Sequence, residues 1–113
     1  MSSRIIKKYP NRRLYDTQES RYITLAEIRQ LVDQQVPFQV IERRSDTDIT
    51  TSVLLQVVSE LESTDARLLG PEVLGALIRA YGAYQQNEVE PQLLGALREL
   101  PEPANVPRVA QHA

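Results

Sequence analysis

The chain has 113 residues, 42% of them hydrophobic, which suits one compact domain with a small appendage. It contains no cysteine and one histidine, His112, beside its C-terminus, which excludes disulfides, zinc sites built from Cys and His, and a Ser-His-Asp triad. No signal peptide is recognisable and no stretch approaches the ~20 apolar residues that cross a bilayer. We therefore expect a cytoplasmic protein without cofactor, metal or membrane contact.

The formal net charge of −2 is distributed unevenly along the chain. Up to Arg21 there are six basic and two acidic side chains, which gives +4, whereas the remainder has seven basic and thirteen acidic side chains, which gives −6. Such an asymmetry is typical of a localised anion-binding face.

The first elements in chain order are short strands. Residues 4–9 are rich in Ile and Tyr and favour a strand, and residues 13–16 favour a returning strand. Pro10 and Asn11 between them indicate a turn. The sequence thus predicts a basic β-hairpin, followed by a short extended stretch over residues 21–23.

A helix follows this stretch. Thr24 and Glu27 have the spacing of a capping box, and the helix should end near Gln34 or Gln35, ahead of a proline. Its predicted inward face consists of Leu25, Ile28, Leu31 and Val32.

The next stretch predicts a second hairpin and a second helix. Residues 38–42 favour a strand, residues 43–47 a polar loop, and residues 48–49 a brief return pairing. Thr50 or Thr51 should cap the helix. The predicted buried stripe of this helix is Leu54, Leu55, Val58 and Leu61.

Two related segments follow at an interval of twenty residues. Residues 71–77 and 91–97 share the pattern P-x-x-L-G-A-L, although a match this short among Leu and Ala can also arise by chance. Each proline suits the first turn of a helix. We expect a helical hairpin over residues 72–85 and 92–100, and a disordered tail from residue 101.

The predicted fold is therefore α+β: a small domain of short β-hairpins and two helices, followed by a C-terminal helical hairpin. The expected boundaries are 1–63 for the first domain, 64–100 for the helical hairpin and 101–113 for the tail.

The basic hairpin is the first candidate for function, because a two-stranded ribbon fits the major groove of DNA. Arginine can contact guanine through two parallel hydrogen bonds, asparagine can do so with adenine, and lysine can hold phosphates. On this basis Arg12 is a candidate base reader. The candidate DNA-contacting residues of the hairpin are Lys7, Lys8, Tyr9, Asn11, Arg12, Arg13 and Tyr15.

Four further residues extend this candidate site. Arg21 and Tyr22 follow closely in sequence. Arg43 and Arg44 form a second cationic spot, which either is an ordinary exposed loop or enlarges the DNA-binding face if both hairpins lie on one side. The alternative for the whole basic segment is a solvated hairpin whose charges keep an edge strand soluble, or a site for an acidic ligand or protein.

Catalysis has little support in the sequence. The candidate carboxylates are explained as solvated or helix-capping groups, so we expect no enzyme. They are Asp16, Glu27, Asp33, Glu42, Asp46 and Asp48.

The predicted helical hairpin carries more apolar surface than it can bury alone. It either packs against the first domain or serves self-association or an apolar ligand, and at least a dimer would suit symmetric DNA half-sites. The candidate residues are Leu74, Leu77, Ile78, Tyr81, Leu94 and Leu97.

Residues 5–17 (IIKKYPNRRLYDT) and 20–25 (SRYITL) also carry a family resemblance, which continues through FQV at 38–40, DIT at 48–50 and LLQVV at 54–58. The chain resembles, over roughly residues 4–62, the N-terminal DNA-binding domain of polyhydroxyalkanoate synthesis repressors, also described as polyhydroxybutyrate accumulation regulators.

The resemblance implies a repressor of granule-associated genes that leaves double-stranded operator DNA when it adsorbs to nascent polyester, and hence a possible association with granules. Two departures stand out: residues 45–47 lack the glycine often found in that loop, and beyond residues 77–82 the C-terminal part diverges. The alternative is a protein-interaction or granule-surface module that does not bind DNA.

Overall fold

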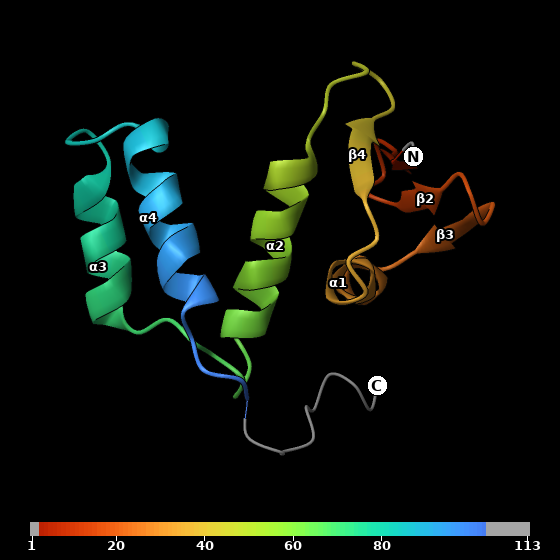
Figure 1. Cartoon of the computed structure of the whole chain (residues 1–113). Helices are drawn as coiled ribbons and strands as arrows, with labels where there is room; N and C mark the ends of the chain where they lie inside the picture. The colour runs from red at the N-terminus through yellow and green to blue at the C-terminus, as the bar shows by residue number, and fades with distance from the viewer. Residues whose placement is uncertain (1–2, 104–113) are drawn as a thin grey trace. The chain divides into compact units, whose positions relative to one another are not determined.

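The computed structural model describes residues 3–103, in which four strands and two helices are followed by two more helices (Figure 1). The predicted α+β class is confirmed. The strands are β1 (Arg4–Lys8), β2 (Leu14–Asp16), β3 (Arg21–Ile23) and β4 (Phe38–Glu42). The helices are α1 (Leu25–Asp33), α2 (Thr50–Glu62), α3 (Pro71–Ala80) and α4 (Gln86–Arg98).

The four strands form one sheet in the order β3-β2-β1-β4. Strand β2 is antiparallel to both β1 and β3, whereas β4 runs parallel to β1, with Arg4 opposite Phe38 and Lys8 opposite Glu42. The basic hairpin is therefore present, but β1 is an interior strand, so the hairpin is not the separate ribbon that the sequence suggested. The brief return pairing is confirmed as a single bridge between Ile41 and Asp48.

One face of the sheet forms the core together with α1 and α2. Ile6 and Val40, on neighbouring strands, are completely buried there, as is Ile28 of α1. This burial of aliphatic surface stabilises the unit in place of the scarce aromatic residues. The full buried cluster is Ile6, Leu14, Ile23, Ile28, Leu31, Val40, Val53 and Val57.

Neither α1 nor α2 covers the other face of the sheet. Because side chains alternate along a strand, the neighbours of the buried residues point to this open face. The strand register aligns one residue from each strand in a row across it, in the order Ile41, Lys7, Tyr15 and Tyr22.

The first helix begins as predicted, with half of the predicted capping box. The Oγ1 atom of Thr24 accepts a hydrogen bond from the backbone N–H of Glu27 at 3.2 Å. The carboxylate of Glu27 instead forms an ion pair with Arg21. The predicted inward position of Val32 is wrong, since it is 46% exposed, one residue around the helix from buried Leu31.

The second helix differs from its prediction in both cap and buried stripe. Its N-cap is Ile49, and neither Thr50 nor Thr51 caps it. The Oγ1 atom of Thr50 accepts from the backbone N–H of Val40 at 2.9 Å and so ties the first turn to β4. In this orientation Val53 and Val57 are buried, with Leu54 and Leu61 packed beside them, whereas Leu55 and Val58 are exposed.

Replacing Thr50 by valine should destabilise the fold. Valine has nearly the same shape but leaves the partly buried N–H of Val40 without its acceptor and removes the hydroxyl that donates to Asp48, so we expect a loss of about 1–3 kcal/mol in the free energy of unfolding. Urea denaturation measures it. The matched control is Thr51→Val, an exposed neighbour for which an equal loss would show that helix propensity, not the hydrogen bond, is responsible.

Asp48, just before α2, makes the stability of the fold depend on pH. Hydrogen bonds from the side chain and the backbone N–H of Thr50, at 2.6 and 2.9 Å, lower the pKa of Asp48 below its ordinary value of 3.8. Because the folded-state pKa is the lower one, the ionised carboxylate contributes stability above the unfolded pKa, and this stability is lost as the pH falls through the folded pKa.

Asp48→Ala should therefore be less stable than the natural protein near neutral pH, and the difference should shrink in acid below the ordinary pKa. Denaturation at a series of pH values tests this, with Asp46→Ala in the same loop as the control. A difference that does not change with pH would contradict the charged hydrogen bonds.

The chain divides into two compact units after Leu68, and the second contains α3 and α4 as an antiparallel helical hairpin (Figure 1). The helices are shifted from their predicted bounds. A turn at Tyr81–Tyr84, with Gly82 at φ 83°, ends α3 early, and a capping box formed by Gln85 and Glu88 starts α4 early. Pro91 consequently lies inside α4, whereas Pro71 begins α3.

Residues 101–103 follow α4 without regular structure. The rest of the predicted disordered tail, with His112, lies outside the described residues. None of the described helices is sufficiently long and apolar to span a membrane.

Candidate nucleic-acid interface

The loop between β1 and β2 spans residues 9–13, and its outer residues are hydrogen-bonded to each other around a tight turn at 10–12. The backbone N–H of Tyr9 donates to the carbonyl of Arg13 at 2.9 Å, and that of Arg12 donates to the carbonyl of Tyr9 at 2.8 Å. Asn11 supports the turn by accepting from the backbone N–H of Arg13 at 3.1 Å. Arg12 has φ 68°, a left-handed conformation that favours glycine and costs other residues about 1–2 kcal/mol.

The loop after β4 lies beside this turn. Parallel strands end at the same edge of a sheet, and the backbone N–H of Arg43 donates to the carbonyl of Lys8 at 2.8 Å. Within the loop, Asp46 adopts φ 61° and occupies the conformation for which a glycine is often used. Both cationic spots therefore meet at one end of the sheet, which is the arrangement in which Arg43 and Arg44 would enlarge the predicted DNA-binding face.

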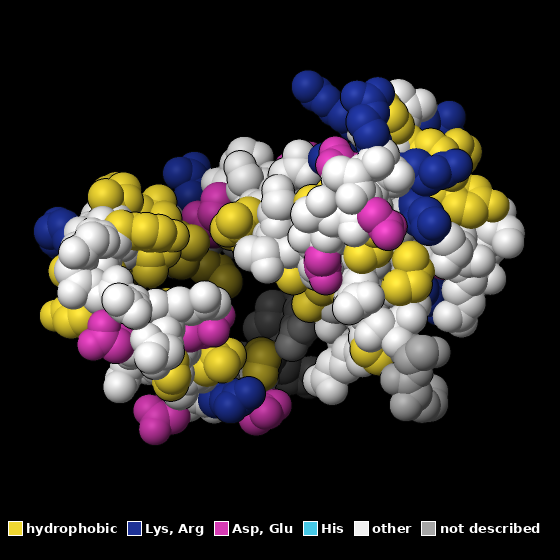
Figure 2. All heavy atoms as spheres, turned by 90° about the horizontal axis from the view of Figure 1, so that it is seen from above, with side chains coloured by type: hydrophobic (Ala, Val, Ile, Leu, Met, Phe, Trp, Pro, Cys, Tyr) yellow, Lys and Arg dark blue, Asp and Glu magenta, His cyan; other side chains and the backbone are white. Residues whose placement is uncertain are grey.

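We call this region the basic end, and Figure 2 shows the Lys and Arg side chains that gather over this part of the first unit. It consists of Lys7, Lys8, Arg12, Arg13, Arg43 and Arg44.

None of these cations is neutralised by a carboxylate in residues 3–103. The ion pairs of that range join Arg4 to Asp16, Arg21 to Glu19 and to Glu27, and Arg29 to Asp33. An unneutralised cationic cluster attracts anions, and phosphates of nucleic acid are anions that such a cluster binds.

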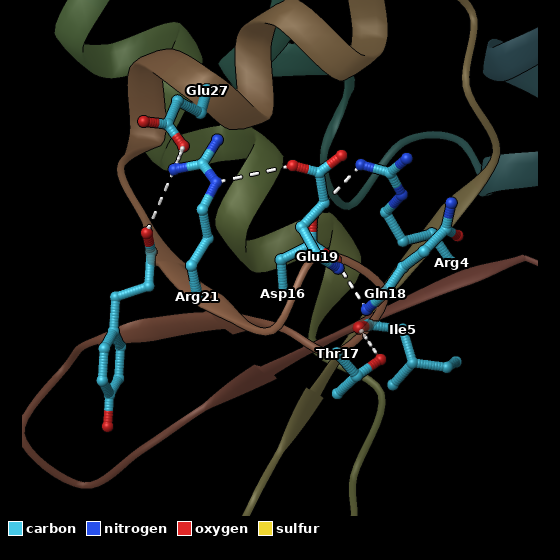
Figure 3. Close-up of polar contacts among 9 residues, drawn as sticks. Arg4, Ile5, Asp16, Thr17, Gln18, Glu19, Arg21 and Glu27 are labelled. Atoms are coloured by element: carbon cyan, nitrogen blue, oxygen red, sulfur yellow. Dashed lines mark hydrogen bonds and ion pairs between the residues drawn. The ribbon is translucent and has the colours of Figure 1, made fainter.

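Arg21 is a predicted DNA contact whose guanidinium forms two ion pairs within the described residues. Its guanidinium lies 3.1 Å from Glu27 and 3.5 Å from Glu19, both carboxylates of its own chain (Figure 3). The pair with Glu27 crosses the junction between β3 and α1, and the pair with Glu19 forms in the turn before β3; neither was predicted from the sequence. Arg21 therefore orients its neighbours and is not a free cation.

Asp16 is a structural residue. It is 2% exposed, accepts from the backbone N–H groups of Gln18 and Glu19 at 2.9 and 3.2 Å, and lies 3.1 Å from Arg4 (Figure 3). Asp16 lies at the end of β2 and begins no helix, so it is neither the solvated nor the helix-capping carboxylate that was predicted. Residues 3–103 contain no group of three or more His, Cys, Asp or Glu placed to hold a metal ion.

Lys7 and Lys8 do not act on the same surface. Lys7 lies in the row on the open face, whereas Lys8 points to the side of the sheet that carries the helices, beyond the core. Alternation along a strand was a signal available in the sequence for this difference. Asn11 is less available for contacts with adenine, because its side-chain oxygen already accepts a hydrogen bond within the turn.

Three tyrosines form a cluster on the open face. The ring centroids of Tyr15 and Tyr22 are 5.2 Å apart, and those of Tyr9 lie 6.4 and 6.1 Å from Tyr15 and Tyr22, all in edge-to-face geometry. The guanidinium of Arg13 lies 3.8 Å from the centroid of Tyr22, and that of Arg43 lies 5.8 Å from Tyr9. The sequence indicated these residue types but not their contacts.

Comparison with known proteins agrees with this geometry. Residues 5–65, more than half of the chain, match the family described as the PHB/PHA accumulation regulator DNA-binding domain. The chain belongs to this family. The predicted resemblance is thereby confirmed, and the PHB/PHA accumulation regulator domain contains the sheet, α1, α2 and the whole basic end, whereas α3 and α4 lie beyond it.

Two relatives match over 85 residues, or 75% of the chain. An uncharacterized protein of Allochromatium vinosum is 53% identical, and an uncharacterized protein in the phbA 5′ region of Thiocystis violacea is 51% identical. The matched stretch covers 56% and 62% of these two proteins, so the chain spans less than two thirds of either. No solved structure matches the chain.

Proposed function

We propose that this chain is a transcriptional repressor that binds duplex operator DNA through the basic end. The observation that supports it most is the set of four arginines from two loops and two lysines from the end of β1, none of them paired with a carboxylate in residues 3–103, inside a DNA-binding domain family. The regulated genes in this proposal are those of polyhydroxyalkanoate granule-associated proteins.

The width of the sheet favours one mode of approach. Four strands at about 4.8 Å spacing span roughly 14 Å between the outer backbones, which exceeds the ~12 Å width of the major groove. The sheet therefore does not enter the groove face-on. The two loops of the basic end enter it instead, while Lys7 of the open face lies against the phosphate backbone.

A salt titration tests this proposal directly. The probe is a labelled duplex selected by the full chain from a random-sequence library, with affinity measured by fluorescence anisotropy. Each phosphate contact contributes about 0.9 to the slope of log K against log salt concentration. Replacing Lys7, Arg12 and Arg44 by glutamine should therefore flatten the slope by about 2.7.

The control carries the same change in charge elsewhere. Replacing Arg67, Arg79 and Arg98 by glutamine also lowers the formal net charge from −2 to −5, and these exposed residues lie outside the family match. This control should keep the natural slope. Equal flattening of the salt slope in both triple variants would mean that overall charge, not the basic end, governs binding. If the natural chain bound no duplex at all, the alternative of an interaction module without DNA binding would be favoured.

Release by polyester is the second part of the proposal. The C-terminal unit exposes large apolar side chains: Leu74 is 40% exposed, Ile78 68%, Tyr81 79% and Leu97 62%. Such surface supports adsorption to an apolar polymer or assembly into at least a dimer. If polymer binds only the DNA-free form, linkage requires that it lower the apparent affinity for DNA.

Adding short-chain polyester to the bound duplex tests this second part. Release from the natural chain, but not from Ile78→Asp, would support adsorption through the C-terminal unit. Sedimentation of both proteins distinguishes loss of assembly from loss of polymer binding. No release at any polyester concentration would contradict the proposed inducer and leave DNA binding unaffected.

A further inference from the structure

Arg13 is held differently from the other cations of the basic end. Its guanidinium lies over the ring face of Tyr22, 3.8 Å from the centroid, whereas that of Arg43 is 5.8 Å from Tyr9. Tyr22 is itself supported by Tyr15, whose ring meets it edge-on at 5.2 Å and 76°. Arg13 thus rests on a ring that its neighbours keep in place.

The backbone of Arg13 is constrained as well. Its N–H donates to the side chain of Asn11 at 3.1 Å, and its carbonyl accepts from the N–H of Tyr9 at 2.9 Å. A long side chain normally loses rotamer freedom when it binds, and a side chain already restrained at both ends loses less. Arg13 is therefore preorganised before DNA arrives.

Stacking leaves the hydrogen-bonding capacity of this guanidinium intact. A guanidinium carbon 3.8 Å from the ring centroid fits a stacked contact, and stacking uses the flat face of the group and leaves its five N–H donors pointing outward in the plane. Within residues 3–103 the Arg13 side chain has no ion pair or hydrogen bond that would occupy them. A planar donor edge with fixed direction is what two parallel bonds to guanine O6 and N7 require.

We infer that Arg13 is the base-reading arginine of the basic end and that Tyr22 is the residue that positions it. Arg12, at the exposed tip and without a ring contact among the described residues, contacts phosphate instead. This inference rests on the proposed function and assigns its sequence specificity to one pair of side chains.

Lysine substitutions separate the two roles because they keep the charge and remove the planar fork. On the selected duplex, Arg13→Lys should bind about 5- to 150-fold more weakly, while its affinity for a scrambled duplex of the same composition stays nearly constant. The matched control Arg12→Lys should bind both duplexes almost as the natural chain does. The salt slope should be unchanged in both variants, since each retains its cation.

A double-mutant cycle tests the positioning role of Tyr22. Tyr22→Leu should lose affinity for the selected duplex only, and Tyr22→Phe, which keeps the ring, should not. Once Arg13 is lysine, adding Tyr22→Leu should cause no further loss of discrimination between the two duplexes. Urea denaturation of each variant checks that it is folded, and if Tyr22→Leu does not fold, Arg13→Lys and Tyr22→Phe still decide the assignment.

Several results would overturn the inference. If Arg13→Lys bound both duplexes as the natural chain does, or changed both affinities by the same factor, Arg13 would not read a base. A loss of discrimination in Arg12→Lys would move base reading to Arg12, and additive losses in the cycle would remove Tyr22 from the mechanism. A natural chain that binds no duplex would instead refute the proposed function, which is a distinguishable outcome.

Discussion

Replacing Asp16 by alanine is expected to destabilise the first unit by about 3–5 kcal/mol, because it removes one partner of a buried ion pair and leaves the other charge uncompensated. Asp16 is 2% exposed, and the side chain of Arg4 is 16% exposed. The Nε atom of Arg4 already has no hydrogen-bond partner among residues 3–103, so the loss of Asp16 would leave this guanidinium poorly satisfied. Chemical denaturation followed by circular dichroism measures the effect.

Two variants show which part of the effect belongs to the charge. Asp16→Asn keeps an oxygen for the backbone N–H groups of residues 18 and 19 but loses the ion pair, so its cost should be intermediate. Asp33→Ala removes the exposed partner of Arg29 and should change stability by only about 0–0.5 kcal/mol. If Asp16→Ala is unfolded in water, titration with trimethylamine N-oxide recovers the comparison, and a cost similar to that of Asp33→Ala would contradict the buried pair.

Replacing Ile6 by alanine should have an effect of similar size. Ile6 is completely buried on an interior strand, in the same cluster as Val40, Ile28 and Val53. Removing its branched side chain leaves a cavity among them, which typically costs about 2–5 kcal/mol. Differential scanning calorimetry of the full chain would record this as a lower midpoint for the first unit.

Ile5→Ala is the matched control for this change. Ile5 is the preceding residue of β1 and points to the open face, where neither α1 nor α2 packs against it. Its replacement should cost less, about 1 kcal/mol, mainly through weaker strand propensity and cross-strand contact. Equal costs at the two positions would mean that the sheet is covered on both faces.

The elements most visible in the sequence were those defined by local patterns. The capping threonine of α1, the turn at Pro10 and Asn11, and the strand over residues 38–42 all follow from neighbouring residues alone. The buried stripe of α2 did not, because this helix is apolar on several sides: Leu55 and Val58 are as hydrophobic as Val53 and Val57. The choice between them is made by the hydrogen bond from Val40 to Thr50, a tertiary contact.

In the candidate site, too, local features were predicted from the sequence and tertiary contacts were not. The sequence identified the cations and tyrosines, because their density exceeds what an edge strand needs. It did not predict that Arg21 would pair with Glu27, because this contact depends on the junction between β3 and α1. It did not predict that Arg13 would lie over Tyr22 either, because this contact depends on how β3 is placed beside β2. It also predicted an isolated ribbon, since the parallel pairing of β1 with β4 joins residues 34 apart in sequence, Arg4 and Phe38, and leaves no local signal.

That parallel pairing has a consequence for the synthesis of the protein. Strand β4 and the loop that follows it leave the ribosome after α1, so a nascent chain can display the first hairpin long before Arg43 stands beside Tyr9. Non-local pairings of this kind form late in folding. An incomplete chain therefore has only part of the basic end in place. Short peptides with the sequence of the first hairpin will for the same reason reproduce this surface poorly.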